Sequence, residues 1–269
     1  MAESLYAVQH IRRMRGGSQA HLLRASDGQF YVTKFTNNPQ HIRVLASEYL
    51  ATRLGILLGL PMAEVRIMDV TDWLIAHSPE LCIDNAGKAV SCAAGQQLAS
   101  RYTADPERDH IFDYLPESMT RRIANLDDFP RVLAFDKWTG NSDGRQAVYV
   151  KHKSARLYRA IFIDQGHCFN AGEWTFPDSP LRGIFSRNYV YEHVTGWRSF
   201  EPVLSSIENI QFSDLASIAA EIPPEWYQHD SEGLARLTKM LHARRSVVRD
   251  LITSFRKSTR SPFPNWTAA

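Results

Sequence analysis

The chain from Phe135 to Gly166 reads FDKWTGNSDGRQAVYVKHKSARLYRAIFIDQG, and the other segments can be ordered around it. It contains two aspartates, Asp143 in a peptide rich in turn-forming residues and Asp164 directly before Gln-Gly. Asp143 precedes a β-prone run at 147–150, and Asp164 closes a second apolar run at 157–163. If the two runs pair as a hairpin, both aspartates come to the same end of it.

Two carboxylates at one end of a hairpin match the needs of phosphoryl transfer. One carboxylate has to lie near the attacking hydroxyl group, and the other has to bind the Mg²⁺ that accompanies the phosphates. The positions of Asp143 and Asp164 therefore predict a site of this kind.

The composition is that of a globular protein. The chain has 269 residues, of which 44% are hydrophobic, so it can bury a substantial core as one large domain or as two lobes. Its 31 basic and 29 acidic residues give a formal net charge of +2. No global electric field therefore indicates nucleic acid or a membrane surface as the partner.

Cysteine usage and the N-terminal segment predict a cytoplasmic protein. Cys82, Cys92 and Cys168 form no close metal-binding pair, and their odd number argues against a disulfide framework. Residues 1–18 lack the apolar core of a secretory signal, and the longest apolar run, near residues 54–63, contains a proline. We therefore expect a reducing compartment and no membrane-spanning segment.

Three consecutive β-strands are predicted at the start of the chain, over residues 5–14, 19–24 and 29–35. The second turn contains Asp-Gly, a strong hairpin signal, so an antiparallel meander is expected. The first turn, Gly16-Gly17-Ser18, lets backbone amides approach a phosphate because glycine tolerates positive φ. An ordinary hairpin turn has the same composition.

A lysine and a glutamate follow in the next two elements. Lys34 ends the third strand among apolar neighbours, where an alternating strand that faces water would also place a lysine. Asn38 as N-cap and Pro39 as first helical residue predict a helix start, and apolar residues at helical spacing continue the helix to Gly59. Its one acid is Glu48, which either points outward or reaches a lysine on the neighbouring sheet.

The middle of the chain is less regular. Residues 62–76 predict a fourth strand and the approach to a fifth. Residues 96–102 predict a strand that crosses between two lobes, and a polar loop is expected over residues 101–108.

Helices dominate after residue 127. Acidic residues before Pro130 predict a helix that stops at Gly140, and Asp136 on its apolar surface is expected to be a structural acid bonded to the following loop. The C-terminal third predicts a short helix over 212–220 and one long helix from Glu232 to Phe255.

This order of parts resembles the protein-kinase-like fold from about residue 6 to residue 170. The resemblance is strongest to the HipA-like kinases, whose relatives include the phosphatidylinositol 3-/4-kinase-like enzymes. It implies a bilobal α+β fold, with an N-terminal antiparallel sheet and one helix over residues 1–103 and a mainly helical C-terminal lobe over residues 104–269.

The resemblance also implies roles for individual residues. Lys34 is similar to the strand lysine that holds nucleotide phosphates, and Glu48 to its partner on the helix. Asp143, in the Asn-Ser-Asp motif, would orient the acceptor hydroxyl and accept its proton. Asp164, in Asp-Gln-Gly, would bind the Mg²⁺ that bridges the phosphates of ATP. The Gly16-Gly17-Ser18 turn would cover those phosphates.

One position departs from the family pattern. Related kinases have a metal-binding asparagine five residues after the catalytic aspartate, and this chain has Val148 there. Valine cannot ligate a hard cation. The nearest amides are Gln146 and Asn141, so the site holds one metal, uses Gln146 as a ligand, or has lost catalysis.

The leading hypothesis is an ATP- and Mg²⁺-dependent kinase that phosphorylates a hydroxyl group, expected to be Ser or Thr of a protein. The alternatives are a pseudokinase that binds nucleotide or a partner without chemistry, and a kinase acting on a lipid or small molecule. The resemblance also suggests an antitoxin-like partner protein, which the sequence itself does not reveal.

Overall fold

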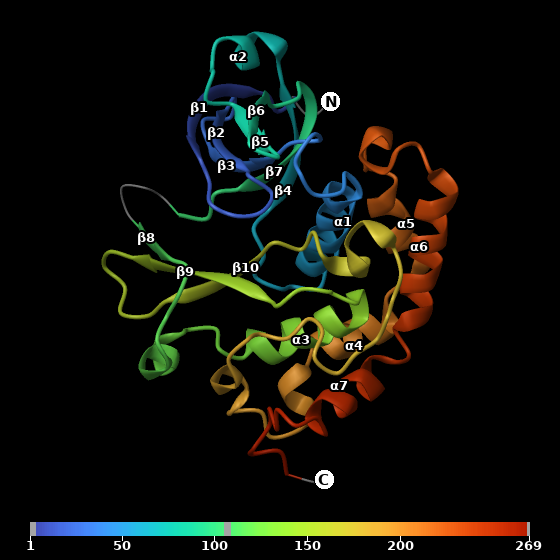
Figure 1. Cartoon of the computed structure of the whole chain (residues 1–269). Helices are drawn as coiled ribbons and strands as arrows, with labels where there is room; N and C mark the ends of the chain where they lie inside the picture. Colours follow the sequence, from blue (N-terminus) through green and yellow to red (C-terminus); the bar gives the residue numbers. More distant parts are fainter. Residues whose placement is uncertain (1–3, 105–108, 268–269) are drawn as a thin grey trace.

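The computed structural model describes residues 4–104 and 109–267. An antiparallel sheet forms the N-terminal part, a mainly helical region forms the C-terminal part, and a second sheet lies between them (Figure 1). The fold class expected from the sequence is therefore confirmed. The expected boundary between residues 103 and 104 remains a prediction.

The N-terminal sheet has five strands in the order β1-β2-β3-β7-β4, and all neighbours are antiparallel. The bounds are β1 Ala7–Arg13, β2 His21–Ala25, β3 Phe30–Lys34, β4 Val65–Val70 and β7 Gly95–Arg101. An additional bridge between Tyr6 and Asp69 brings the two edges of the sheet together, so the sheet curls toward a closed barrel. The three strands expected at the start of the chain are confirmed.

Strand β7 corrects the expectation of a strand that crosses between lobes. It pairs with β3 on one side and β4 on the other, so it lies wholly within the N-terminal sheet. The polar loop expected at 101–108 begins after β7, and its residues 105–108 lie outside the described part of the chain.

Two local expectations, a helix start at Asn38 and the approach to a fifth strand, are wrong. Helix α1 (Arg43–Leu57) begins five residues after Asn38, because the Asn38 amide is used in a turn that follows β3. Its Nδ2 donates to the carbonyl of Phe35 and its Oδ1 accepts from the amide of Gln40. The expected approach to a fifth strand is helix α2 (Asp72–Ala76), whose first turn is capped by the Thr71 hydroxyl.

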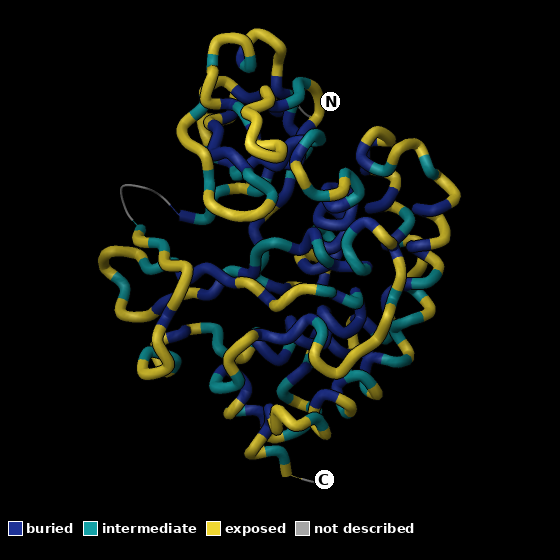
Figure 2. The backbone as a smooth tube through the Cα atoms, in the orientation of Figure 1, coloured by how far each residue is buried: buried dark blue, intermediate teal, exposed yellow. Residues whose placement is uncertain are grey.

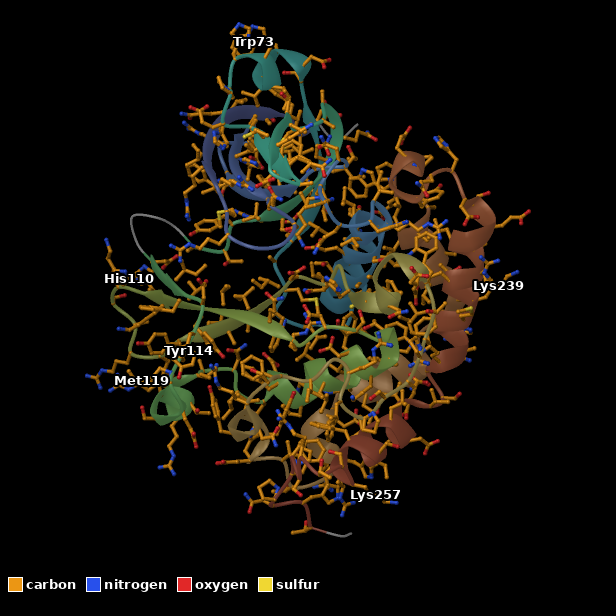
Figure 3. All side chains as sticks on the ribbon, viewed as in Figure 1. Trp73, His110, Tyr114, Met119, Lys239 and Lys257 are labelled. Carbon is orange, nitrogen blue, oxygen red and sulfur yellow. The ribbon has the colours of Figure 1, made fainter. Side chains whose placement is uncertain are left out.

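Helix α2 carries Trp73 away from the sheet at the tip of the N-terminal part (Figure 3). Trp73 is 65% exposed, and its ring stacks on that of His77 at a centroid distance of 4.3 Å. The chain then forms a two-stranded hairpin of β5 (Cys82–Asn85) and β6 (Lys88–Ser91), which closes at a turn through Ala86 and Gly87.

Helix α1 lies between the N-terminal sheet and the helical region (Figure 1). Its apolar residues Leu45, Leu50 and Leu54 belong to the same core as helix α3 (Asp128–Thr139), whereas Leu23 and Val70 belong to a separate core under the N-terminal sheet. The path of α1 is buried along most of its length in Figure 2. The C-terminal region therefore fixes where α1 sits.

The second sheet contains the hairpin expected from the sequence. Its order is β10-β9-β8, with bounds β8 Asp109–Phe112, β9 Gln146–His152 and β10 Arg159–Ile163. Gln146 pairs with Ile163 at one end of the hairpin, so the segments that contain Asp143 and Asp164 meet at that end. Strand β8 has no counterpart in the sequence prediction.

The C-terminal region is built from α-helices joined by short 3₁₀ helices. The α-helices that follow α3 are α4 Val203–Asn209, α5 Phe212–Ala219, α6 Ser231–Arg244 and α7 Val248–Arg256. The 3₁₀ helices are η1 Glu117–Arg122, η2 Cys168–Glu173, η3 Asn188–Tyr191, η4 Trp197–Phe200 and η5 Pro224–Tyr227. Within the described residues, no helix is long and apolar enough to cross a bilayer.

The single long helix expected from Glu232 to Phe255 is wrong, because α6 and α7 are separate helices. Their apolar residues continue one heptad-like pattern, so sequence periodicity does not reveal the break. Contacts around the break are tertiary: Arg244 donates to backbone carbonyls of α3, and Arg245 donates to the carbonyl of Ile210.

A pair of histidines, the buried His21 and the half-buried His10, links the N-terminal sheet to the β5–β6 hairpin. Because the Cys82 carbonyl can only accept, the Nε2 of His21 carries the proton donated to it, at 3.1 Å. The Nδ1 of His21 then accepts from the Nε2–H of His10, also at 3.1 Å. Burial, the largest effect, lowers the pKa of His21 from 6.5 to about 4.

We expect this histidine to make the fold sensitive to acid. Between pH 4 and 6.5 the unfolded chain binds more protons at this position than the folded chain. The free energy of unfolding is therefore highest above pH 6.5 and decreases as the pH drops from 6.5 to 4. The loss approaches about 1.4 kcal/mol per pH unit in this window. Urea unfolding at pH 7 and pH 5 should show a smaller drop for His21→Gln than for the wild type, and equal drops would contradict the prediction.

Candidate active site

The site forms at the end of the β9–β10 hairpin, where Asp164 follows β10 directly. Asp164 has a left-handed backbone with φ of 60°, which is uncommon for a residue other than glycine. Such strain persists only where the surroundings hold it, and it is common at functional sites. Figure 1 shows this end of the hairpin facing α1.

Lys34 is buried, which corrects the simpler expectation of a solvated lysine. Its residue exposure is 7%, and its ammonium Nζ lies 2.5 Å from Glu48 Oε2 and 2.8 Å from Asp164 Oδ1. One cation therefore joins β3, α1 and the end of β10. Burial alone would lower the pKa of Lys34, but the two carboxylates outweigh it and raise the pKa, so the lysine stays charged.

The two acids beside Lys34 have opposite electrostatic character. Burial would raise the pKa of Asp164, yet Lys34, His167 and Arg145 outweigh this effect and lower it. Glu48 is 4% exposed, and its burial raises its pKa despite the attraction of Lys34. Asp164 is thus the acid held ionised, with a side chain that is still 30% exposed.

Asp143 and Asp164 are linked by the side chain of Gln146. The amide Nε2 of Gln146 makes long contacts with Asp143 Oδ2 at 3.5 Å and Asp164 Oδ2 at 3.4 Å. Asp143 and Gln146 are both exposed to solvent, and Asp143 Oδ1 accepts from the amide of Gly144 at 2.7 Å. Turning the Gln146 amide over would place its oxygen between the two carboxylates.

Val148 lies on the same face of β9 as Gln146, because side chains two residues apart in a strand share a face. It pairs with Ile161, two residues farther from Asp164 than the Gln146–Ile163 pair. Val148 is 7% exposed, and it makes this face of β9 apolar beyond the carboxylates. Gln146 is therefore the β9 residue beside Asp164, and Val148 is not.

Asn141 is not available as a ligand in this arrangement. Its side chain is 1% exposed, its Nδ2 donates to Asp136 Oδ1 at 3.0 Å, and its Oδ1 accepts from the amide of Asp143 at 3.1 Å. The two bonds fix the loop that carries Asp143. They also show Asp136 as the structural acid bonded to this loop, as expected from the sequence.

Arg145 is the residue that sequence reasoning missed. Both its side chain and that of Asp136 have no exposed area, and its Nε lies 2.9 Å from Asp136 Oδ2 while Nη2 contacts Oδ1. Its Nη1 donates to the Ile163 carbonyl at 3.1 Å and to Gln165 Oε1 at 2.8 Å. One guanidinium therefore ties α3 and the Asp143 loop to the Asp164 turn. A buried acid predicted at position 136 was the signal that a cationic partner was needed.

Gly166 permits the close approach of the Asp164 turn to α1. A Cβ at this position would lie 2.5 Å from Val44 Cγ1 and 3.3 Å from Glu48 Oε2. The glycine is thus required by packing against the helix that carries Glu48.

The Gly16-Gly17-Ser18 turn joins β1 to β2 at the end of the sheet where Lys34 lies, since His21 pairs with Thr33. Gly16 has φ of 128°, and a Cβ on Gly17 would lie 3.7 Å from Gln40 Nε2. After the turn, the side-chain amide of Gln19 makes two hydrogen bonds with the backbone of Asp84. Its Nε2 donates to the Asp84 carbonyl at 2.8 Å, and its Oε1 accepts from the Asp84 N–H at 2.6 Å. The β5–β6 hairpin therefore anchors this turn, and its role toward phosphates stays a prediction.

Among residues 4–104 and 109–267, no cluster of three or more His, Cys, Asp or Glu side chains could hold a metal ion. A metal at this site would therefore rely on few protein ligands. This is the usual arrangement for Mg²⁺, which keeps waters and is held by one or two carboxylates together with substrate phosphates.

Solved structures with the same fold include several kinases. The chain matches the proinflammatory kinase CtkA of Helicobacter pylori with a TM-score of 0.51 and 12% identity, over 88% of this chain and 96% of that chain. It matches the Golgi casein kinase with Mn/ADP bound with a TM-score of 0.54 and 12% identity, over 94% of this chain and 74% of that chain.

A third neighbour is HipA of Shewanella oneidensis MR-1, solved with HipB and its operator DNA. The TM-score is 0.54 at 12% identity, over 96% of this chain and 75% of that chain. At this identity the likeness shows the fold alone. No curated protein matches the sequence.

The family model for the HipA-like kinases matches residues 8–257, from the first strand to the end of the last helix. This range contains Lys34, Glu48, Asp143 and Asp164, and it covers the hairpin, the α-helices and all of the N-terminal sheet except Ala7. The chain belongs to the HipA-like kinase family.

Proposed function

We propose that this protein transfers the γ-phosphate of Mg·ATP to a hydroxyl group, with Ser or Thr of a protein as the acceptor. The observation that carries the proposal is the position of the Lys34 ammonium, in contact with both Glu48 and Asp164 at the end of the hairpin where Asp143 also lies. A buried cation held beside the half-buried Asp164 and near the exposed Asp143 suits phosphate binding next to an acid that can receive a proton.

The oxygen atoms at this end of the hairpin fit a hard divalent cation. Asp164 is held ionised by Lys34, its Oδ2 is free of the lysine, and Gln146 offers an amide oxygen after rotation. When bound, Mg²⁺ would neutralise charge on the phosphates during transfer. Asp164 and Gln146 are the proposed ligands.

Asp143 is the proposed base. Its loop is rigid because Asn141 is bonded to both Asp136 and the Asp143 amide. One of its oxygens is occupied by the Gly144 amide, and the other faces the Gln146 side chain at the exposed surface. In this role, Oδ2 would orient the acceptor hydroxyl and take its proton as phosphorus–oxygen bond formation proceeds.

Val148 supports nucleotide binding through contact rather than through a metal. Val148, Ile161 and Ile163 share the face of the hairpin on which Gln146 lies, and they make it apolar beyond the carboxylates. An apolar surface of this kind suits the flat ring of a purine base.

The test of the proposed function is γ-phosphate transfer to a protein acceptor, including the chain itself. The wild type should incorporate phosphate, and Asp143→Ala and Asp164→Ala should each lower the rate by at least about 100-fold, since each removes a group that acts in the transition state. Equal phosphate incorporation by all three proteins would contradict the proposed kinase function.

The role of Gln146 gives a separate prediction. If its oxygen is a metal ligand, Gln146→Ala should raise the Mg²⁺ concentration for half-maximal transfer by about 10- to 100-fold. Gln146→Glu keeps an oxygen at this place and serves as the matched control. An unchanged Mg²⁺ titration for Gln146→Ala would mean that waters and Asp164 suffice.

A pseudokinase is the second candidate, and Val148 is the observation that favours it. A nucleotide-binding protein without transfer should show a rise in melting temperature with Mg·ATP but no labelled product. The absence of any shift would count against both the kinase and the pseudokinase. A kinase acting on a small molecule or a lipid remains the third candidate, separated by the choice of acceptor in the transfer assay.

Compartment and partner belong to the same proposal. The three cysteines are free thiols, which supports a reducing compartment such as the cytoplasm. The HipA neighbour was solved with HipB and operator DNA. For this chain we propose a protein acceptor and no direct nucleic-acid contact, because the formal net charge is only +2.

A further inference from the structure

Trp174 joins helix α1 to the segment that follows the Asp164 turn. It comes directly after η2 and is 5% exposed. Its indole Nε1–H donates to the Ser47 hydroxyl at 3.1 Å, and this hydroxyl donates to the Ala171 carbonyl at 3.1 Å. Ser47 has no exposed area. The result is a buried relay of two hydrogen bonds between α1 and η2.

Arg43 extends this relay to the C-terminal helices. Its guanidinium lies 4.7 Å from the centre of the Trp174 ring, and its Nη2 lies 2.8 Å from Asp230 Oδ2. The other oxygen of Asp230 caps α6 by accepting from the Gly233 amide at 2.8 Å. The Trp174 ring is therefore covered by a cation that is itself fixed to α6.

The backbone around Trp174 has no local preference for its conformation. Phe169, Asn170, Ala171 and Trp174 have φ values of 58°, 59°, 56° and 53°. Left-handed conformations are unfavourable for residues with a Cβ, so tertiary contacts have to hold this segment. The relay to Ser47 is a direct contact of this kind.

Ser47 is next to Glu48 in the helix, so the relay is linked to the position of Glu48. A shift of α1 that broke the bond from Trp174 to Ser47 would also move Glu48 away from Lys34. Gly166 lies against Val44 and Glu48 without room for a Cβ, so α1 and the Asp164 turn are in tight contact on the same side.

We propose that Trp174 is a positioning residue that, through Ser47, holds α1 where Glu48 meets Lys34. Its catalytic consequence rests on the proposed kinase function, whereas its effect on α1 does not. Trp174 touches neither acceptor nor phosphate in this proposal, and it acts only through the helix.

Hydrogen exchange of α1 is the first test, and it is independent of catalysis. Trp174→Phe keeps an aromatic ring but removes the indole N–H, and Ser47→Ala removes the hydroxyl without touching the ring. Trp174→Phe should speed exchange of the amides at 44–54 by about 5- to 10-fold, the factor for losing one buried hydrogen bond, and Ser47→Ala, which loses two, should speed it by at least as much. Trp138→Phe, which loses an indole bond to the Leu241 carbonyl, is the control and should leave α1 exchange unchanged.

A double-mutant cycle on phosphate transfer is the second test. Trp174→Phe should lower kcat/KM for ATP by about 5- to 10-fold in the wild type and have little effect when Glu48→Gln is already present, because both changes then act on one interaction. Full additivity, or unchanged α1 exchange in both Trp174→Phe and Ser47→Ala, would overturn the proposal. If the wild type transfers no phosphate, the proposed function fails, and the exchange experiment still decides the role of Trp174.

Discussion

Arg145→Met should destabilise the protein by about 3–5 kcal/mol, the usual cost of removing one partner of a buried ion pair. The change leaves the carboxylate of Asp136 with no exposed area and without its cation. It also removes the donors to the Ile163 carbonyl and to Gln165. Urea unfolding measured for wild type and variant gives the difference directly.

The matched control is the double variant Arg145→Met/Asp136→Leu. Replacing both charges with apolar residues of similar size removes the unpaired buried charge, so part of the lost stability should return, while the Ile163 carbonyl, Gln165 and Asn141 stay without these partners. Transfer activity should stay low, because Asn141 loses its partner and the Asp143 loop is no longer fixed. A double variant less stable than the single one would show that the pair itself, rather than the stranded charge, dominates.

Lys34→Met should lower the rate of phosphate transfer by at least about 100-fold, since it removes a positioned cation from a partly dehydrated site. The Lys34 ammonium contacts two carboxylates, so its loss also brings Glu48 and Asp164 into unscreened repulsion. Transfer assays with Lys88→Met, which changes an exposed lysine of β6, provide the control. Comparable activity of Lys34→Met and wild type would exclude a phosphate-binding role.

The same variant has a predicted pH signature. Burial already raises the pKa of Glu48, and Lys34 opposes that rise, so removing the lysine should raise the pKa further. A carboxyl group whose pKa is higher in the folded than in the unfolded state is protonated preferentially when folded, so stability falls as the pH rises through that interval. Lys34→Met should therefore lose more stability than the wild type as the pH rises above 4.5, the ordinary pKa of a glutamate, and Lys34→Met/Glu48→Gln should not.

The first three strands and the hairpin with its two aspartates could be predicted because each depends on local patterns. Alternating apolar residues, Asp-Gly and the glycine that ends α3 act over a few residues. Gly140 has a φ of 59° and closes α3 as expected. The start of α1 could not be predicted because the side chain of Asn38 can either cap a helix or stabilise a turn. In the structure it stabilises a turn.

The prediction of one long C-terminal helix was wrong for a different reason. The apolar positions of α6 and α7 fall on one continuous helical pattern, and only the bonds of Arg244 and Arg245 to other segments coincide with the break. Periodicity reports which residues are buried, but it carries no information about a change of helix direction. The choice between one helix and two was therefore tertiary.

The sequence by itself determined the kinase-like order of elements and the identity of Lys34, Glu48, Asp143 and Asp164 as candidate site residues. The two aspartates follow from residue types and spacing along the chain, whereas Lys34 and Glu48 became candidates through the resemblance to the HipA-like kinases. The tertiary structure alone showed that the Lys34 ammonium meets acids 14 and 130 residues away, and that Gln146 rather than Val148 lies beside Asp164. Contacts across such separations depend on how elements pack, and packing is not encoded in any local pattern.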